Sequence, residues 1–405
     1  MRKVLRSAGV TVLALLVAAP AAARSLKDTL GGASEKVQIS GGSAFDALAE
    51  NIADTAARSL PIVSASAGFT YRYNPSIEAF ERSTDTLGPL FLERPDTLGR
   101  GKINVNVSFQ YVQFDEFDGD DIKGLESSDA IVLNVLDSAG NVIGRRASRL
   151  AYSLGIQNYV TAFSFTYGIL DDLDVNLLIP VIATTLKVGV QSQQLQSGPP
   201  GGAFTPDPGP LLVGRTGGHA TGVGDLLVRL KYQLPRLEWL RSAAALQLRL
   251  PSGNEDDFQG TGSFEASPFL FASTILWDRV EPHANIGIDL RADDVARSQA
   301  RYGVGVDVDV HPRVGLALGF LGRSEFEGSA DADETSFLHL TSAGVQQRPL
   351  LGLDFGRKDF YDVSFGVRGV VFRNVMVFAN VIRALNDDGL RNDTVIPAFG
   401  VEGTF

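Results

Sequence analysis

Strict alternation of apolar and polar side chains recurs from residue 101 to the end of the chain, and it constrains the fold more than any other feature of the sequence. In the stretch AALQLRLPSGNEDD, residues 243–256, leucines alternate with Gln247 and Arg249 before acidic residues and glycine follow. A period of two residues is typical of a β-strand with two different faces. In a soluble sheet the apolar face would cover a core. In a membrane barrel the leucines would face lipid, and Gln247 and Arg249 would face the lumen.

The alternating stretches predict about 12 strands, an even number as in bacterial single-chain barrels. Two further strands in 63–73 and 345–355 would raise the number to about 14. The predicted strands are 103–111, 158–168, 173–186, 225–234, 243–250, 265–276, 283–290, 302–310, 313–324, 361–372, 374–384 and 393–405.

The connections between these strands alternate between two lengths. Tight links are predicted at 170–173, 235–239, 277–280, 311–313 and 373–374. Long or polar connections are predicted at 115–157, 187–221, 251–264, 293–300, 325–360 and 386–392. Short periplasmic turns opposite longer extracellular loops are typical of outer-membrane barrels. The fold class predicted is therefore all-β, a transmembrane antiparallel β-barrel.

The N-terminal part of the chain does not alternate. Residues 1–23 combine a basic start, a short apolar run and small residues, which predicts a signal peptide for export to the bacterial outer membrane. Residues 24–60 are predicted to form a periplasmic or plug segment with one short helix, because Phe45, Leu48, Ile52 and Ala56 recur at helical spacing. A mobile leader and a plug inside the barrel are both compatible with this pattern. Residues 61–405 are assigned to the barrel.

Composition excludes several classes of protein. The chain has no cysteine, so it has neither a disulfide framework nor a thiolate metal site. Its formal net charge is −11, and the predicted signal peptide removes three positive charges and no acids. An acidic exported protein lacks the basic stripe that nucleic acid requires, so no nucleic-acid partner is expected.

The chain ends in an aromatic residue on an alternating strand. Val395, Phe399, Val401 and Phe405 all have the parity that would face lipid. Phe405 is therefore expected to be the residue through which the outer-membrane assembly machinery recognises the chain. Outer-membrane lipid and lipopolysaccharide are the other macromolecular partners expected.

Several stretches together resemble one family. They are GVGDLLVRLKYQL, LQLRLPSGNEDDFQGTGSFEASPFLFAS, DLDVNLLIPVI, TLGRGKINVNVSFQYV and the C-terminal NVMVFANVIRALNDDGLRNDTVIPAFGVEGTF. They are similar to the outer-membrane transporters associated with the meta-pathway of phenol degradation, relatives of the long-chain fatty-acid channels. The resemblance extends from about residue 66 to the C-terminus. It implies a barrel that passes small hydrophobic or aromatic compounds, with the N-terminal segment as a hatch. Residues 24–60 contain no Asn-Pro-Ala hatch motif of the fatty-acid channels.

The lumen-lining candidates are polar or charged side chains on the inward parity of the predicted strands. They are Asp225, Arg229, Lys231, Gln247, Arg249, His283, Asp289, Asp307 and Asp309. Opposite charges on neighbouring strands pair across a barrel wall and keep its interior polar. A structural network of this kind is favoured over a substrate path. Side chains of both charge signs in a narrow bore are better suited to filling the lumen than to selecting a substrate.

A second set of candidates lies in the predicted long loop 187–221, whose apolar side chains would capture a ligand outside the barrel. They are Phe204, Leu211 and Leu212, followed by Val213. Exposed apolar residues on a mobile loop can make a first contact with an apolar molecule.

Catalytic and metal-binding patterns are not found. The four histidines, His219, His283, His311 and His339, form no pair at metal-ligand spacing. No serine, histidine and acid can be assembled into a lipase site, so no enzyme, metal or cofactor is predicted.

The sequence therefore predicts a monomeric outer-membrane barrel for passive uptake of small hydrophobic or aromatic compounds. The alternatives are a structural or partner-binding barrel with a closed lumen and a soluble exported β-protein.

Overall fold

The computed structural model describes residues 24–39, 43–58, 71–74, 79–82, 92–235, 237, 239–277, 279–328, 336–372 and 374–405. The predicted signal peptide, residues 1–23, lies outside the described residues.

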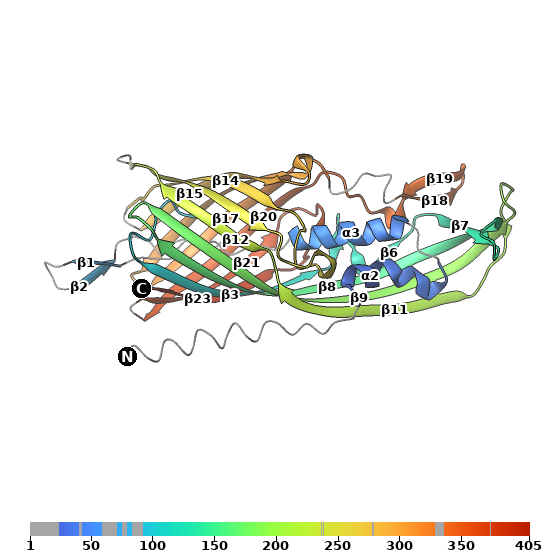
Figure 1. The fold of residues 1–405 in the computed structure, drawn as a ribbon, viewed down its shortest axis with the longest axis horizontal. Helices are drawn as coiled ribbons and strands as arrows, with labels where there is room; N and C mark the ends of the chain where they lie inside the picture. The colour runs from blue at the N-terminus through green and yellow to red at the C-terminus, as the bar shows by residue number, and fades with distance from the viewer. Residues whose placement is uncertain are drawn as a thin grey trace.

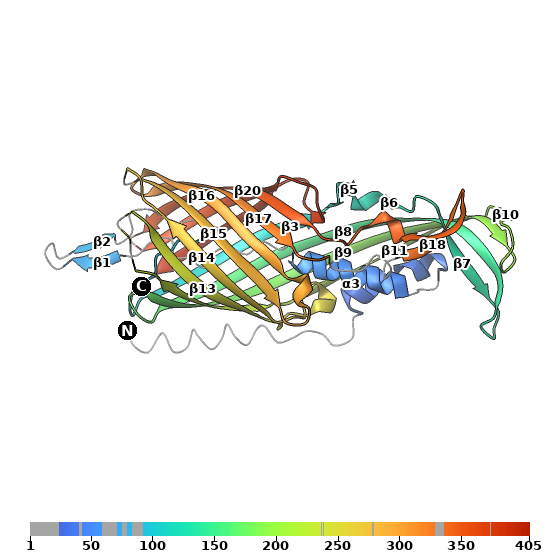
Figure 2. The same ribbon diagram turned by 90° about the horizontal axis from the view of Figure 1, so that it is seen from above.

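Twelve antiparallel strands form the closed wall of a barrel (Figures 1 and 2), as the alternation predicts. In wall order they are β3 (Ile103–Phe114), β8 (Val142–Gly168), β9 (Leu173–Gly198), β12 (Leu226–Gln233), β13 (Arg241–Leu250), β14 (Glu265–Ser273), β15 (Val280–Arg291), β16 (Gln299–His311), β17 (Val314–Glu325), β20 (Asp359–Phe372), β21 (Val375–Ala384) and β23 (Ile396–Thr404). The last strand pairs with the first, with Val401 opposite Val107. The backbone of Phe405 completes the closure, since its N–H donates to Ile103 O at 2.7 Å.

The remaining strands are short or lie beyond the barrel. They are β1 (Tyr71–Asn74), β2 (Ala79–Arg82), β4 (Glu116–Phe117), β5 (Asp120–Asp121), β6 (Leu125–Glu126), β7 (Ala130–Leu136), β10 (Thr205–Pro206), β11 (Leu211–Val223), β18 (Ser336–Thr341), β19 (Gly344–Pro349) and β22 (Leu390–Arg391). Of the two extra wall strands considered in the sequence, the one at 345–355 is not a wall strand, and the one at 63–73 lies mostly outside the described residues. β1 pairs only with β2, residues 63–70 lie outside the described residues, and β19 pairs with β18.

The strands β8, β9 and β11 continue well beyond the barrel on one side (Figure 1). β8 has 27 residues and spans about 90 Å at 3.3 Å per residue, whereas a tilted membrane strand needs only about 10 residues. We call the extension the part formed by β6, β7, β11, β18, β19 and the distal halves of β8 and β9. The tight turns and the C-terminus lie at the opposite end of the barrel.

The extension corrects the prediction of a long loop at 187–221. β9 continues to Gly198, and β11 pairs with it from Leu211 to Val223. The apolar alternation of β9 does not stop at Leu186, because Val188 and Val190 continue it on the inner face. Helices cover that face, so lipid is not needed to bury it. The connection predicted at 115–157 likewise contains β4 to β7 and the first half of β8.

The N-terminal residues fold into three helical segments against the inner face of the extension (Figure 2). They are α2 (Leu26–Gly31), the 3₁₀ helix η2 (Gly32–Val37) and α3 (Ser43–Arg58). The predicted amphipathic helix is confirmed as α3, and the side chains of Phe45, Leu48, Ile52 and Ala56 are all buried. They pack in one cluster with Tyr152, and the ring centroids of Phe45 and Tyr152 lie 6.5 Å apart.

Four further 3₁₀ turns lie in the connections: η3 (Ile122–Gly124), η4 (Glu255–Asp257), η5 (Val295–Arg297) and η6 (Leu350–Gly352). Among the helices of the described residues, none combines the length and the apolar character needed to cross a membrane.

The wall has the inverted pattern of a membrane barrel. Its outer face carries exposed large apolar side chains, and its inner face carries buried polar ones. On β13, Leu246 is 46 % exposed and the neighbouring Gln247 is 3 % exposed. Inside the wall, Asn176 donates to Ser164 Oγ at 2.8 Å and to Thr166 Oγ1 at 2.9 Å. The leucines of AALQLRL therefore lie on the outside, and Gln247 and Arg249 lie on the inside.

Candidate functional site: the lumen and the mouth of the barrel

All nine lumen-lining candidates have the inward orientation expected of them. Eight are buried, and the side chain of Arg229 is 14 % exposed. These residues are Asp225, Arg229, Lys231, Gln247, Arg249, His283, Asp289, Asp307 and Asp309. The strand parity assigned from the sequence is thus the parity of the structure.

The lumen also contains a segment that the alternation does not reveal. Residues 92–98, which we call the lumen segment, lie inside the wall near the tight-turn end. Glu93 forms an ion pair with Arg229, and Asp96 lies 2.7 Å from Arg241 Nη1. The ammonium group of Lys231 donates to the backbone carbonyl of Asp96 at 2.8 Å. The lumen segment therefore neutralises cations that project from β12 and β13.

Glu281 of β15 is the centre of this network. Its carboxylate lies 3.4 Å from Arg94 Nη1 and 2.5 Å from Arg241 Nη2. The side chain of Glu281 is fully buried and that of Arg94 is 2 % exposed. A buried carboxylate between two guanidinium groups compensates charges that would otherwise be costly to remove from water.

Two inward glycines on β16 explain how the lumen segment fits. A Cβ atom on Gly303 would lie 2.4 Å from Leu92 Cδ2, and one on Gly305 would lie 2.8 Å from Leu92 Cδ1. A Cβ atom at either position would force the side chain of Leu92 to move, and one on Gly305 would also meet His283 Nε2 at 2.6 Å. The signal for the lumen segment was therefore present in the sequence, as glycines on a lumen-facing parity.

Further ion pairs lie on the inner face of the wall, several of them nearer the mouth. Arg249 Nε lies 3.0 Å from Glu265, and Asp289 lies 2.6 Å from Arg301 Nε. Asp225 accepts the backbone N–H of Thr261 at 2.9 Å, which fixes the connection 251–264 over the barrel. Asp307 pairs with Arg368 at 2.7 Å at the level of Glu281, which lies opposite Asp307 in the register of β15 and β16. His283 Nδ1 lies 3.7 Å from Asp307. The predicted lining residues thus pair mostly with charged or polar residues outside the predicted set, such as Glu265, Arg301 and Arg368.

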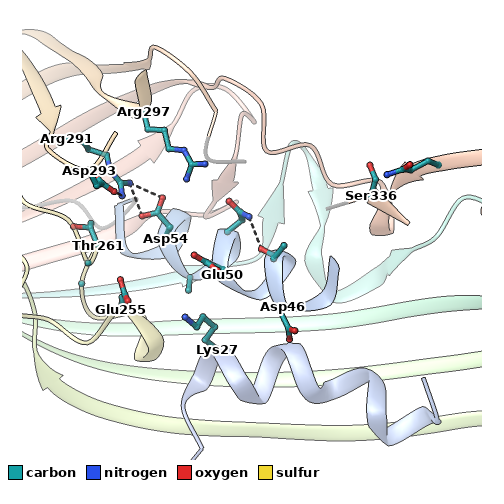
Figure 3. A pocket seen from close by; sticks show the side chains of 16 residues that line it. Lys27, Asp46, Glu50, Asp54, Glu255, Thr261, Arg291, Asp293, Arg297 and Ser336 are labelled. Atoms are coloured by element: carbon teal, nitrogen blue, oxygen red, sulfur yellow. Dashed lines mark hydrogen bonds and ion pairs between the residues drawn. The ribbon is translucent and has the colours of Figure 1, made fainter. Parts of the chain in front are cut away.

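The helices are attached at the mouth of the barrel, the end that carries the long connections (Figure 3). Asp54 of α3 lies 3.2 Å from Arg291 Nη1 at the end of β15. Arg58 Nη1 lies 4.0 Å from Glu325, and its other terminal nitrogen donates to Arg297 O at 3.0 Å.

The first helix adds two contacts with the connection 251–264. The N–H of Leu26 donates to Asp257 Oδ1 at 3.0 Å, and Lys27 forms an ion pair with Asp256. The hydrogen bond to Asp256 raises the pKa of Lys27 above its ordinary value. We call Asp54–Arg291, Arg58–Glu325 and Lys27–Asp256 the mouth ion pairs.

A cavity of about 810 Å³ separates α3 from the loops of the mouth (Figure 3). Charged groups dominate its lining, which includes Lys27, Asp46, Glu50, Asp54, Glu255 and Arg291. A polar lining of this kind suits a hydrated vestibule better than a dry apolar pocket.

The second set of candidates occupies the far part of the extension. Arg145 lies over the ring of Phe204 at 4.9 Å from its centroid. Leu211 is 55 % exposed, whereas Leu212 packs against the buried cluster under the helices. The prediction that these residues share a mobile loop is wrong, because Leu211 and Leu212 belong to β11.

Metal chemistry has no candidate in the described part of the chain, where no group of three or more His, Asp or Glu side chains could hold an ion.

The fold and the site define the class of the protein. A closed antiparallel wall with an apolar exterior, a polar interior and tight turns at one end is a transmembrane β-barrel of the bacterial outer membrane. The tight-turn end is periplasmic, and the mouth and the extension are extracellular.

The comparison with protein families refines this class. Residues 135–336 match the model of the family described as "Putative MetA-pathway of phenol degradation". The match confirms, over these residues, the resemblance that the sequence motifs carry. No curated protein sequence matches the chain.

Solved structures of outer-membrane channels are similar to the chain. The COG4313 outer membrane channel from Pseudomonas putida F1 shares 13 % identity with a TM-score of 0.42, over 76 % of this chain and 97 % of that one. A Pseudomonas aeruginosa FadL homologue shares 10 % identity with a TM-score of 0.33, over 75 % and 89 %. The P. putida toluene transporter TodX shares 10 % identity with a TM-score of 0.32, over 75 % and 88 %.

Proposed function

We propose that the protein is an outer-membrane channel for passive, non-enzymatic uptake of small hydrophobic or aromatic compounds. The observation that carries the proposal is the seating of the N-terminal helices over the mouth. Their apolar face packs against the inner face of the extension, and their polar contacts with the barrel lie at the mouth. An apolar ligand can compete for such an apolar contact, whereas an ion cannot.

Residues 24–58 act in this proposal as an extracellular plug. They contact the connection 251–264 and the ends of β15 and β17, and these lie at the mouth. The match to a phenol-degradation family model supports an aromatic substrate class. Leu211, exposed on the extension, and Phe204 beside it are suitable for a first contact with an apolar molecule. Phe405, exposed at the periplasmic end, is suited to recognition by the assembly machinery.

The experiment is uptake of labelled toluene or phenol by liposomes with and without the purified, heat-modifiable barrel. Faster and saturable uptake of the aromatic, with no change for glucose, is the expected result. Acceleration of neither aromatics nor fatty acids over bare liposomes would refute the proposal.

The buried network around Glu281 favours a second candidate, a structural or partner-binding barrel with a closed lumen. Ion pairs of Glu281 with Arg94 and Arg241 connect the lumen segment to the wall, and the side chains of Glu281 and Arg94 have almost no exposure. This candidate predicts no aromatic flux, and also none after the mouth ion pairs are removed. Flux that rises on their removal would exclude it.

A further inference from the structure

A groove of about 760 Å³ lies on the outer surface where β8, β9 and β11 leave the membrane. Its lining includes the small residues Ser153, Gly155 and Gly189. Its charged lining residues are Lys123, Lys187 and Arg215, together with one acid, Glu126. We call this feature the cationic groove.

The outward-facing apolar side chains of the wall form a surface that we call the lipid-facing belt. Strand register places the cationic groove just beyond this belt, on the side of the mouth. Tyr159 lies opposite Tyr111 and Ala183, and the rings of the two tyrosines are 5.0 Å apart. Aromatic pairs of this kind mark the interface between hydrocarbon and headgroups. Beyond Ala183, towards the mouth, the outward-facing residues of β9 change from apolar side chains to Thr185 and then Lys187.

The distance from the belt fits the headgroup layer. Lys187 follows Ala183 by four residues, about 13 Å along the strand and about 10 Å along the membrane normal at a tilt of about 40°. The polar region of a bilayer begins within this distance of the hydrocarbon edge.

The cations stand open toward that layer. Lys187 has glycine opposite it on both neighbouring strands, at Gly155 and Gly217. Arg215 lies opposite Gly189, so no side chain shields it from that strand. Within the parts of the chain that the structure describes, neither Lys187 nor Arg215 forms an ion pair. In a chain of net charge −11, two exposed cations without an ion pair at this height favour the binding of an external anion.

We propose that the cationic groove binds the phosphate groups of the outer-leaflet glycolipid, the lipid A part of lipopolysaccharide. Guanidinium and ammonium groups recognise phosphate through charge-assisted hydrogen bonds. Basic clusters next to a membrane surface attract anionic lipids in the same way. The small floor admits the sugar that carries the phosphate, and the adjoining apolar belt accepts the acyl chains. This inference is independent of what passes through the lumen.

The test measures binding of fluorescent bisphosphorylated lipid A to the detergent-purified full barrel. The double variant Lys187→Gln with Arg215→Gln is compared with the control Arg279→Gln with Arg313→Gln, which removes two exposed cations at the periplasmic turns. The first variant is expected to bind at least about tenfold more weakly, because it loses two charge-assisted contacts. The control and the variant Lys187→Arg are expected to bind as the unchanged protein does. Heat-modifiability verifies that each variant is folded.

Two further probes separate the sources of phosphate. Lipid A from which both phosphates have been removed is expected to bind weakly and equally to all variants. Inorganic phosphate at the same concentration is expected not to compete. Equal binding of lipid A by both double variants, no loss on removal of the phosphates, or full competition by inorganic phosphate would each overturn the proposal.

Discussion

Arg291 at the end of β15 and Asp54 in α3 are 237 positions apart in the chain, yet Arg291 Nη1 lies 3.2 Å from Asp54 Oδ1. This contact fixes the N-terminal helices to the rim of the barrel. Arg291 also binds Asp293, at 2.8 Å, so its charge is shared between the helix and its own connection. If α3 moves away from the rim, Arg291 therefore still has Asp293 as a partner and does not become an isolated cation.

Replacement of Asp54 by asparagine is expected to loosen the helices. The change removes the negative partner of Arg291 and of Arg58, whose guanidinium lies 3.9 Å away. We expect toluene flux into liposomes to increase several-fold while the barrel stays heat-modifiable. The control is Asp129→Asn, which breaks the exposed pair with Arg348 on the extension. Equal flux in both variants would show that the rim contact does not hold the plug.

Replacement of Glu281 by glutamine is expected to destabilise the barrel strongly. The variant leaves Arg94 and Arg241 without the buried carboxylate between them. Loss of one partner from a buried pair costs roughly 3 kcal/mol or more. The measurement is the urea midpoint of unfolding in detergent. Asp359→Asn, which breaks the exposed pair with Arg357, is expected to leave the midpoint unchanged.

The sequence predicted the wall well because the physical cause of the pattern is local. Each strand must present one face to lipid and one to the lumen, so parity alone orients Leu246, Gln247 and Arg249 correctly. The same argument applies to α3, where Phe45 and Ile52 share a buried face at helical spacing.

Alternation could not reveal where the membrane ends or what fills the barrel. Val188 and Val190 continue the pattern of β9 although protein, and not lipid, covers them. The lumen segment has no period at all, because Glu93 and Asp96 are positioned by partners more than a hundred residues away. Its signal in the sequence is the inward glycines that face Leu92, namely Gly303 and Gly305 of β16 and Gly319 of β17.

Those glycines provide a direct test of the lumen segment. A Cβ atom on Gly303 would meet Leu92 Cδ2 at 2.4 Å and the backbone oxygen of Phe320 at 2.9 Å. Gly303→Ala is therefore expected to displace the lumen segment and to increase ion conductance in planar bilayers. Gly124→Ala is the matched control, since nothing lies within 4 Å of its Cβ position. Unchanged conductance in a folded Gly303→Ala barrel would mean that the lumen segment does not limit the bore.

One part of the mouth's response to pH follows from Asp293, the second partner of Arg291. Its hydrogen bonds from Arg291 hold the pKa of Asp293 well below the ordinary value of about 4. A carboxyl group with a lowered pKa contributes stability that is complete above the ordinary value and is lost only as the pH falls through the lowered one. The arrangement of Arg291 is therefore expected to persist from pH 8 to pH 5.

Spin-label mobility on the helices measures this directly. The chain has no cysteine, so Glu35→Cys introduces a single labelling position on exposed η2. We expect the same label mobility at pH 8 and at pH 5. We also expect a modest rise in label mobility in 1 M salt, because salt screens the partly exposed Lys27–Asp256 pair. A sharp gain in mobility between pH 8 and pH 5 would mean that another titratable group of the mouth ion pairs, and not the Arg291–Asp293 pair, sets the pH response.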